Sequence, residues 1–304
     1  MINTTLKTSF ISNLLMGSLA VLSTSLFAAD LEIEIYRGQL IPEANSAILM
    51  TADEALVIDA QFLRPDALAV LSIIKGSGRK LTSILITHGH PDHVWGAVEL
   101  LKQYPDAKVY ARQLILDEIR LEFRARLLRW TEDFPEHLPT SLFDIQPLVG
   151  NTFNFSGHEI EVIDLQPAET INATAYYIPE LKTYIGGDQI FYKYHAYIGA
   201  GLNYPEVWIK SIETIKNGYD IDLVIPGHGP AGDASVLDSA IEYLEEYASV
   251  YKPLQKQSVM VRHMLERYPE YGLKEVLFMT IGPAVTAPDL IEMMRGNLGF
   301  AEEH

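Results

Sequence analysis

Residues 86–96, ITHGHPDHVWG, bring together four side chains that can bind metal ions or transfer protons. They are His88, His90, Asp92 and His93, directly after the apolar run LTSILI. Because His88 and His90 are two positions apart, an extended loop can turn both imidazoles toward one ion. Asp92 and His93 are adjacent and can serve a second ion nearby. The spacing predicts part of a metal site, for which the rest of the chain must supply further ligands.

The elements around this stretch predict a mixed fold. β-rich runs at 32–37, 46–51 and 55–60 are separated by turn-forming residues and precede a helical pattern at about 64–75. The second half has the same kinds of element, with a hairpin, two paired strands, a helix near 205–217, the strand DLVIPGHG and a helix at about 234–251. Periodicity alone predicts an α/β or α+β class.

The first 29 residues are typical of a secretory signal peptide. Lys7 is followed by the uncharged stretch FISNLLMGSLAVLSTSLF, which ends in small residues before Asp30. The alternative is a retained membrane anchor, but Ser, Thr and Asn residues interrupt the apolar run. We therefore expect a signal peptide at 1–29, a periplasmic or secreted protein, and no membrane attachment after cleavage.

Composition restricts the classes of partner and of catalytic group. The 304 residues have a formal net charge of −17, so a phosphate backbone would be repelled and nucleic acid is a poor partner. The chain has no cysteine, which excludes thiolate ligands, thiol nucleophiles and disulfides. These features favour a small-molecule substrate and leave the oligomeric state open.

The segment THGHPDH resembles the T-H-x-H-x-D-H signature of the metallo-β-lactamase superfamily. VIDA before the first helix, GGD ending at Asp188 and PGHG around His228 match the family in the same order. The resemblance covers most of 32–250 and implies a four-layer αββα sandwich. It divides the chain into a signal peptide at 1–29 and one domain at 30–304, with a helical insertion at 112–147 and a helical extension at 252–304.

The resemblance also implies a ligand set for two divalent ions. His88 and His90 resemble ligands of the first metal, and three residues resemble ligands of the second, namely Asp92, His93 and His228. Asp188 occupies the position of the bridging carboxylate; by itself, an aspartate after Gly-Gly is more often a turn residue. Asp59 resembles a buried aspartate that braces the ligand loop, although Gln61 stands where the family often has glycine.

Glu169 departs from the family pattern. The family usually has Gly-His-Thr between the two halves, whereas this chain reads QPAETINAT. We expect Glu169 to replace the histidine as a ligand of the first metal, because carboxylate oxygen binds Zn²⁺ at a distance similar to imidazole. The alternative is a carboxylate that caps a helix or turn. The extra negative charge makes the cluster a weaker Lewis acid and favours iron or manganese more than usual; zinc remains the expected metal.

The predicted reaction is hydrolysis of a small ester, lactone or lactam by a hydroxide that bridges two metals, with Asp92 orienting the nucleophile and relaying its proton. The alternatives are a β-lactamase proper, an alkylsulfatase-like hydrolase and a non-hydrolytic diiron redox or metal-binding protein. His195 is either a second-shell partner of the metals or a partly buried loop histidine.

Four arginines in 112–130 are conspicuous on an acidic protein. Arg120, Arg124, Arg126 and Arg129 either bind an anionic substrate group or pair with Glu118 and Glu122 on a solvated helix face.

Overall fold

The computed structural model describes residues 31–40, 42–198, 205–250 and 257–279. These residues belong to one compact unit within Leu31–His304. The predicted signal peptide at 1–29 lies outside the described residues, as do residues 252–256 and 280–304 of the predicted C-terminal extension. Among the described residues, no helix combines the length and the apolar character needed to cross a membrane.

The first sheet contains six strands in the order β1-β2-β3-β4-β5-β6. They are β1 (Glu32–Arg37), β2 (Asn45–Met50), β3 (Glu54–Ile58), β4 (Lys80–Leu85), β5 (Lys108–Ala111) and β6 (Gln146–Pro147). β1, β2 and β3 pair antiparallel, while β3 through β6 pair parallel. The carboxyl ends of β3, β4 and β5 therefore meet at one edge of this sheet, and the histidine-rich loop begins there.

The second sheet contains five strands in the order β11-β10-β9-β8-β7. They are β7 (Thr152–Phe155), β8 (His158–Asp164), β9 (Thr174–Ile178), β10 (Thr183–Phe191) and β11 (Leu223–His228). β7 through β10 pair antiparallel, and β10 and β11 pair parallel. A 3₁₀ turn at Pro179–Leu181 connects β9 to β10.

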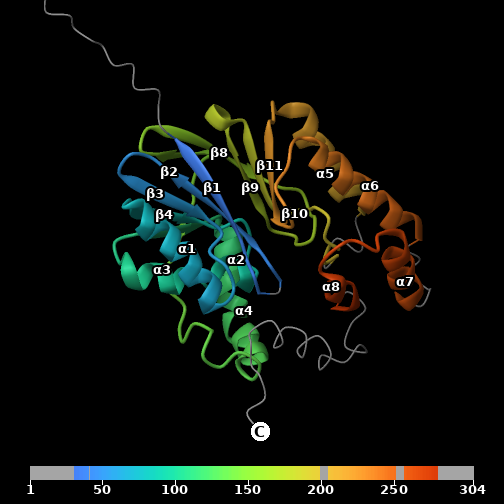
Figure 1. Cartoon of the computed structure of the whole chain (residues 1–304), viewed down its shortest axis with the longest axis horizontal. Helices are drawn as coiled ribbons and strands as arrows, with labels where there is room; N and C mark the ends of the chain where they lie inside the picture. Colours follow the sequence, from blue (N-terminus) through green and yellow to red (C-terminus); the bar gives the residue numbers. More distant parts are fainter. Residues whose placement is uncertain (1–30, 41, 199–204, 251–256, 280–304) are drawn as a thin grey trace, which may run out of the picture. The chain divides into compact units, whose positions relative to one another are not determined.

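Helices cover the outer faces of both sheets (Figure 1). On the side of the first sheet lie α1 (Arg64–Ser77), α2 (Pro91–Val94), α3 (Ala97–Gln103) and α4 (Gln113–Thr131). On the side of the second lie α5 (Pro205–Gly218), α6 (Ser235–Val250) and α7 (Gln257–Arg267). The short α8 (Lys274–Met279) contributes Val276 to the core beneath the first sheet's helices and Leu277 to the core beneath the second's. α1 begins with Pro65 in its first turn and ends at Gly78, whose φ of 75° terminates the helix.

Alternation of side chains along the strands explains the layers. On β3, Val57 packs into the core beneath α1 and α3, whereas Leu56 and Ile58 point into the core between the sheets. Tyr176 and Ile185 of the second sheet contribute to that same central core. A third core lies between the second sheet and its helices. The predicted four-layer αββα sandwich is confirmed.

The predicted insertion at 112–147 is not helical throughout. α4 ends at Thr131, and the segment closes with β6, which extends the first sheet. Tyr110 pairs with Gln146 and Ala111 with Pro147 in parallel register. A strand of two residues has too little sequence to show a period of two, so no pattern distinguished it from the loop.

Candidate metal centre

The seven predicted ligands come from segments that are far apart in the sequence. They are His88 and His90 in the loop after β4, Asp92 and His93 on α2, Glu169 in the loop between β8 and β9, Asp188 on β10, and His228 at the end of β11. In α2, Pro91 occupies the first turn and Asp92 follows at the amino end.

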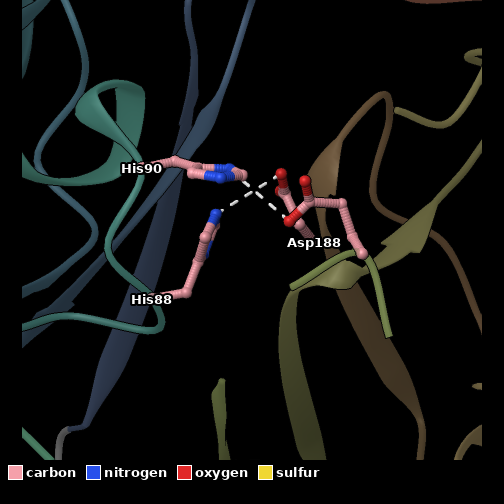
Figure 2. Close-up of side chains that lie close together, drawn as sticks. His88, His90 and Asp188 are labelled. Atoms are coloured by element: carbon pink, nitrogen blue, oxygen red, sulfur yellow. Dashed lines mark ion pairs between the residues drawn. The ribbon is translucent and has the colours of Figure 1, made fainter. Parts of the chain in front are cut away.

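The structure brings these side chains into two adjoining groups. In the first, ligand atoms of His88, His90, Glu169 and Asp188 all lie within 4.8 Å of one another. The second contains Asp92, His93 and His228 on the same criterion. Figure 2 shows His88 and His90 approaching from the loop of the first sheet and Asp188 facing them from the second. Each group thus combines two imidazoles with at least one carboxylate, a donor set suited to a divalent ion.

Asp188 lies between the two groups. Its Oδ2 is 3.5 Å from Nε2 of His88, and its Oδ1 is 3.2 Å from Nε2 of both His93 and His228. The two oxygens of one carboxylate therefore face different groups, as a bridging ligand requires. Asp92 faces the second group, with its Oδ2 3.4 Å from Nε2 of His93 and 3.3 Å from Nε2 of His228.

A local irregularity in the second sheet positions Asp188. The register of β10 against β11 shifts on both sides of Gly187, which has a φ of 50°. Gly227 of β11 passes so close that a Cβ there would lie 2.1 Å from Oδ1 of Asp188. The carboxylate thus occupies space that only a glycine at position 227 leaves free.

Glu169 has the environment of a ligand rather than of a cap. Its side chain is 1% exposed, and neither of its oxygens has a hydrogen-bond partner. Oε2 lies 3.5 Å from Nδ1 of His90. A capping carboxylate would accept a hydrogen bond from a backbone N–H, and Glu169 accepts none. The contacts therefore favour the interpretation that Glu169 replaces the missing histidine.

Asp59 fixes the orientation of the ligand loop, as its resemblance to the bracing aspartate implies. It accepts hydrogen bonds from the backbone N of Thr87 (2.8 Å), the hydroxyl of Thr87 (2.7 Å) and Nδ1 of His93 (2.7 Å). Because the Thr87 hydroxyl donates to Asp59, it can accept from Nδ1 of His88, which lies 3.0 Å away. One carboxylate thereby favours the tautomer of both His88 and His93 in which Nε2 is free to bind a metal.

Gln61, at a position where the family often has glycine, adopts a backbone conformation that glycine favours. Its φ is 76°, in the left-handed region that usually favours glycine. The buried side-chain amide donates to the carbonyl of Ala44 (2.8 Å) and contacts Oγ of Ser46 (2.9 Å). These two bonds offset the conformational cost of the left-handed backbone at this position.

Two contributors to the site were not identified from the sequence. Thr87 could have been found from the sequence, because it is the first residue of the T-H-x-H-x-D-H signature. Its hydroxyl connects His88 to Asp59. The carbonyl of Pro42 accepts a 2.8 Å hydrogen bond from Nδ1 of His228, which leaves Nε2 facing Asp92 and Asp188. A backbone carbonyl has no sequence signature, so this contact could not be predicted.

The unsatisfied polar atoms at the site match the donors that metal ions need. Buried atoms without a hydrogen-bond partner include Nε2 of His88, Nε2 of His93, Oδ1 of Asp188 and both oxygens of Glu169. Buried polar groups are rarely left unpaired, because each costs about 1–3 kcal/mol. Their convergence on one place fits a site that bound cations would complete.

Burial and charge set the protonation of the carboxylates. Burial raises the pKa of Glu169, and Asp188 and Asp92 raise it further, to well above its ordinary value. For Asp92 and Asp188, burial also acts upward, but the surrounding histidines outweigh it and hold both pKa values well below the ordinary range. Glu169 is therefore the carboxylate whose ionised form most needs a nearby cation.

His195 lies in a cluster of tyrosines. It is fully buried, its Nδ1 lies 3.0 Å from the hydroxyl of Tyr243, and its ring contacts that of Tyr271. Burial, followed by Lys274, lowers its pKa to about 4. These contacts connect it to the C-terminal helices, and its predicted second-shell role beside the metals stays a prediction.

The four arginines that the sequence analysis singled out differ in exposure and in their ion pairs. Arg120 and Arg124 are exposed, and Arg129 pairs with Asp133 at 3.1 Å. Arg126 donates through Nε to Glu122 at 2.6 Å and lies 3.8 Å from Glu118. Arg126 therefore forms the predicted pairing with both Glu118 and Glu122, and it also lines a cavity beside the ligands.

Comparison with known proteins places this geometry in a family. A family model described as the metallo-beta-lactamase superfamily matches residues 40–241. The hydroxyacylglutathione hydrolase of Prochlorococcus marinus is 28% identical over 175 residues, 54% of this chain and 56% of the relative. That of a Synechococcus species (strain JA-3-3Ab) is 31% identical over 137 residues, 45% of this chain and 44% of the relative. The chain thus spans about half the length of these curated relatives.

Solved structures show the same fold. A metallo-beta-lactamase from Pontibacter korlensis aligns with a TM-score of 0.55 and 20% identity, over 71% of this chain and 99% of that one. The superfamily match includes all seven converging side chains, and the aligned structures share the sandwich that positions them. On the combined strength of sequence and fold, the chain belongs to the metallo-β-lactamase superfamily.

Proposed function

We propose that the protein is an exported hydrolase that holds two divalent metal ions and cleaves a small ester, lactone or lactam. The observation that supports this most strongly is the convergence of seven ligand side chains with buried, unpaired donor atoms among them. The hydrolase names of the sequence relatives support the reaction class. Residues 1–29, which have the composition of a signal peptide, support the proposal that the protein is exported.

The chain's own residues would hold the ions in two similar environments. His88, His90 and Glu169 would bind the first and Asp92, His93 and His228 the second, with Asp188 shared. Two bound divalent ions would supply an activated water and polarise the scissile carbonyl. Asp92 is 14% exposed and lines the cavity, whereas Glu169 is 1% exposed. Asp92 is thus the carboxylate best placed to orient that water and accept its proton.

Zinc is the proposed metal, with iron or manganese as the alternatives that the carboxylate-rich set allows. Metal analysis of protein purified without added metal, together with its visible absorption spectrum, separates these cases. Zinc gives no visible absorption, whereas a diiron site does. A coloured protein that contains iron and hydrolyses nothing would support the redox alternative instead.

A second candidate reaction follows from the relatives. Those named hydroxyacylglutathione hydrolase favour cleavage of a thioester. The predicted export argues against it, because glutathione conjugates are chiefly cytosolic substrates. The Bacillus relative named metallo-beta-lactamase type 2, 22% identical over 70% of this chain, keeps β-lactam hydrolysis among the reactions to be tested.

One substrate panel tests the proposal. Metal-loaded protein is assayed with chromogenic esters, lactones, thioesters, sulfates and cephalosporins. His90→Ala should abolish hydrolysis while circular dichroism stays native, because His90 is at the edge of the cluster and 19% exposed. His263→Ala, which changes a surface histidine paired with Glu246, is the matched control. Equal turnover by both variants would reject the metal-dependent reaction.

Export is tested separately. The full-length chain is expressed in a bacterium, cells are fractionated, and the N-terminus of the recovered protein is sequenced. We expect a mature protein that begins near residue 30 in the periplasm or medium. An intact N-terminus in the cytoplasmic fraction would refute export without affecting the proposed chemistry.

A further inference from the structure

A cavity of about 280 Å³ opens beside the candidate ligands. Its lining includes His90, Asp92, Asp188 and His228, and the rest of the lining is predominantly apolar. The volume is close to the lower end of small-molecule sites, which span roughly 300–1,000 Å³. A group bound in this cavity would therefore lie directly next to the metal-binding atoms.

Two apolar walls face the cavity. Phe62, after β3, and Trp130, on α4, form one wall with their rings in an edge-to-face contact at 5.5 Å. Leu273, directly before the C-terminal helix α8, and Val276, within it, form part of the other. Elements outside the strands that position the ligands thus determine the shape of the cavity.

Backbone hydrogen bonds fix the second wall to the loop that follows Asp188. The N–H of His195 donates to the carbonyl of Gly272 at 2.9 Å, and the N–H of Gly272 donates to the carbonyl of Lys193 at 2.9 Å. A Cβ on Gly272 would lie 2.8 Å from the ring of Tyr194, so the two segments are in close contact. Leu273 follows directly, which gives this wall a defined position.

The cationic side chain in the lining is already neutralised. Among the described residues that line the cavity, Arg126 supplies the guanidinium and no lysine accompanies it. This guanidinium pairs with Glu122 and lies 3.8 Å from Glu118. Both acids, with Asp117, line a second hollow of about 590 Å³ that shares His90 and Tyr197 with the first. Around Arg126, an anionic substrate group would therefore meet more negative than positive charge.

We propose that the site selects substrates whose acyl group is apolar and uncharged, and that this group binds between Trp130 and Val276. This inference rests on the proposed hydrolase function and names its substrate class. Burial of apolar surface favours such a group, whereas an anionic group gains little from a guanidinium that two carboxylates already neutralise.

A series of neutral p-nitrophenyl esters with increasing straight acyl chains tests the apolar cavity. We expect kcat/KM of the metal-loaded protein to rise by up to about fourfold per added methylene until the cavity is full. Val276→Phe should reduce kcat/KM for the long chains and spare the acetate ester. Val259→Phe, at an exposed position of α7, is the matched control. A flat dependence on chain length in the wild type would overturn the proposal.

The charge of the site is tested with a matched pair of esters, one neutral and one ending in a carboxylate. The wild type should prefer the neutral ester. Glu122→Gln removes one of the two carboxylates that face Arg126 and should raise relative activity on the anionic ester about fivefold, as expected for one unit charge at close range in water. Glu245→Gln, an exposed residue of α6, carries the same charge change and should have no effect. A wild-type preference for the anionic ester would refute the proposal.

A binding measurement separates this proposal from the proposed hydrolysis. Neutral alkyl hydroxamates of increasing length are titrated into metal-loaded protein by calorimetry. Affinity that rises with chain length and falls in Val276→Phe supports the apolar site even if no ester is cleaved, and in that case only the hydrolase proposal fails. Length-independent binding alongside active hydrolysis contradicts the apolar site alone.

Discussion

Glu169→Gln provides the sharpest test of the metal centre, because it should change the stability of the metal-free and metal-loaded protein in opposite directions. The substitution keeps the shape of the side chain and removes the charge. In the metal-free protein both carboxylate oxygens are buried without a hydrogen-bond partner. Burial and the nearby Asp188 and Asp92 disfavour the ionised carboxylate, so removal of the charge should raise the free energy of unfolding by about 1–3 kcal/mol.

The same change should weaken the first metal site. Mutation of groups that only support a ligand lowers metal affinity by about 10–100-fold, so loss of a direct ligand should cost at least about 100-fold. At a fixed free metal concentration, a 100-fold loss removes about 2.7 kcal/mol of metal-linked stabilisation. Metal content should fall from two ions per chain to one when the protein is equilibrated with a chelator of intermediate strength.

The assay is urea unfolding with and without chelator, combined with elemental analysis of the dialysed protein. Glu159→Gln is the control, because this glutamate is on β8 and exposed to solvent. A variant that keeps two metals and loses stability without metal would show that Glu169 has a structural role. The assignment of the substituted ligand would then be wrong.

Three further outcomes follow from contacts around the site and the C-terminal helices. Asp59→Asn should lower metal affinity by about 10–100-fold in a chelator competition, because Asp59 fixes the tautomers of ligand histidines; unchanged affinity would exclude that role. Gly227→Ala should lower the free energy of unfolding in urea by about 1–3 kcal/mol and should weaken metal binding, because the added Cβ would displace Asp188. Gly218→Ala, whose added Cβ would meet open space, should retain metal. The pKa of His195 is lowered from 6.5 to about 4, so the unfolded chain binds a proton that the folded one does not, and stability falls as pH drops from about 6.5 to 4. The difference in the free energy of unfolding between pH 7 and pH 4.5 should be smaller in His195→Gln than in the wild type, by at most about 3 kcal/mol. An identical pH dependence in the two proteins would contradict this prediction.

Much of the site could be predicted from local sequence. His88, His90, Asp92 and His93 are close in the chain, and a short loop after a buried strand leaves their side chains few directions. The alternation of strands and helices could be predicted too, because β-rich runs alternate with segments of helical periodicity.

The role of Glu169 could not be settled in this way. A glutamate in a loop of turn-forming residues fits a cap as well as a ligand, and only its position in space separates the two. Its oxygens lie buried and unpaired next to His90, which comes from the other sheet. Arg126 is a similar case, because the sequence was compatible both with an anion-binding site and with ion pairs on the helix surface. Its contacts with Glu118 and Glu122 are visible only in the structure.

The sequence by itself determined the kinds of donor atom available and the alternation of strands and helices, since both depend on residue type and local spacing. The tertiary structure decided which donors lie together and what lines the adjoining cavity. Those relations join residues as distant as Pro42 and His228, or Trp130 and Val276, and depend on how two sheets and their helices pack. No local period in the chain encodes that packing.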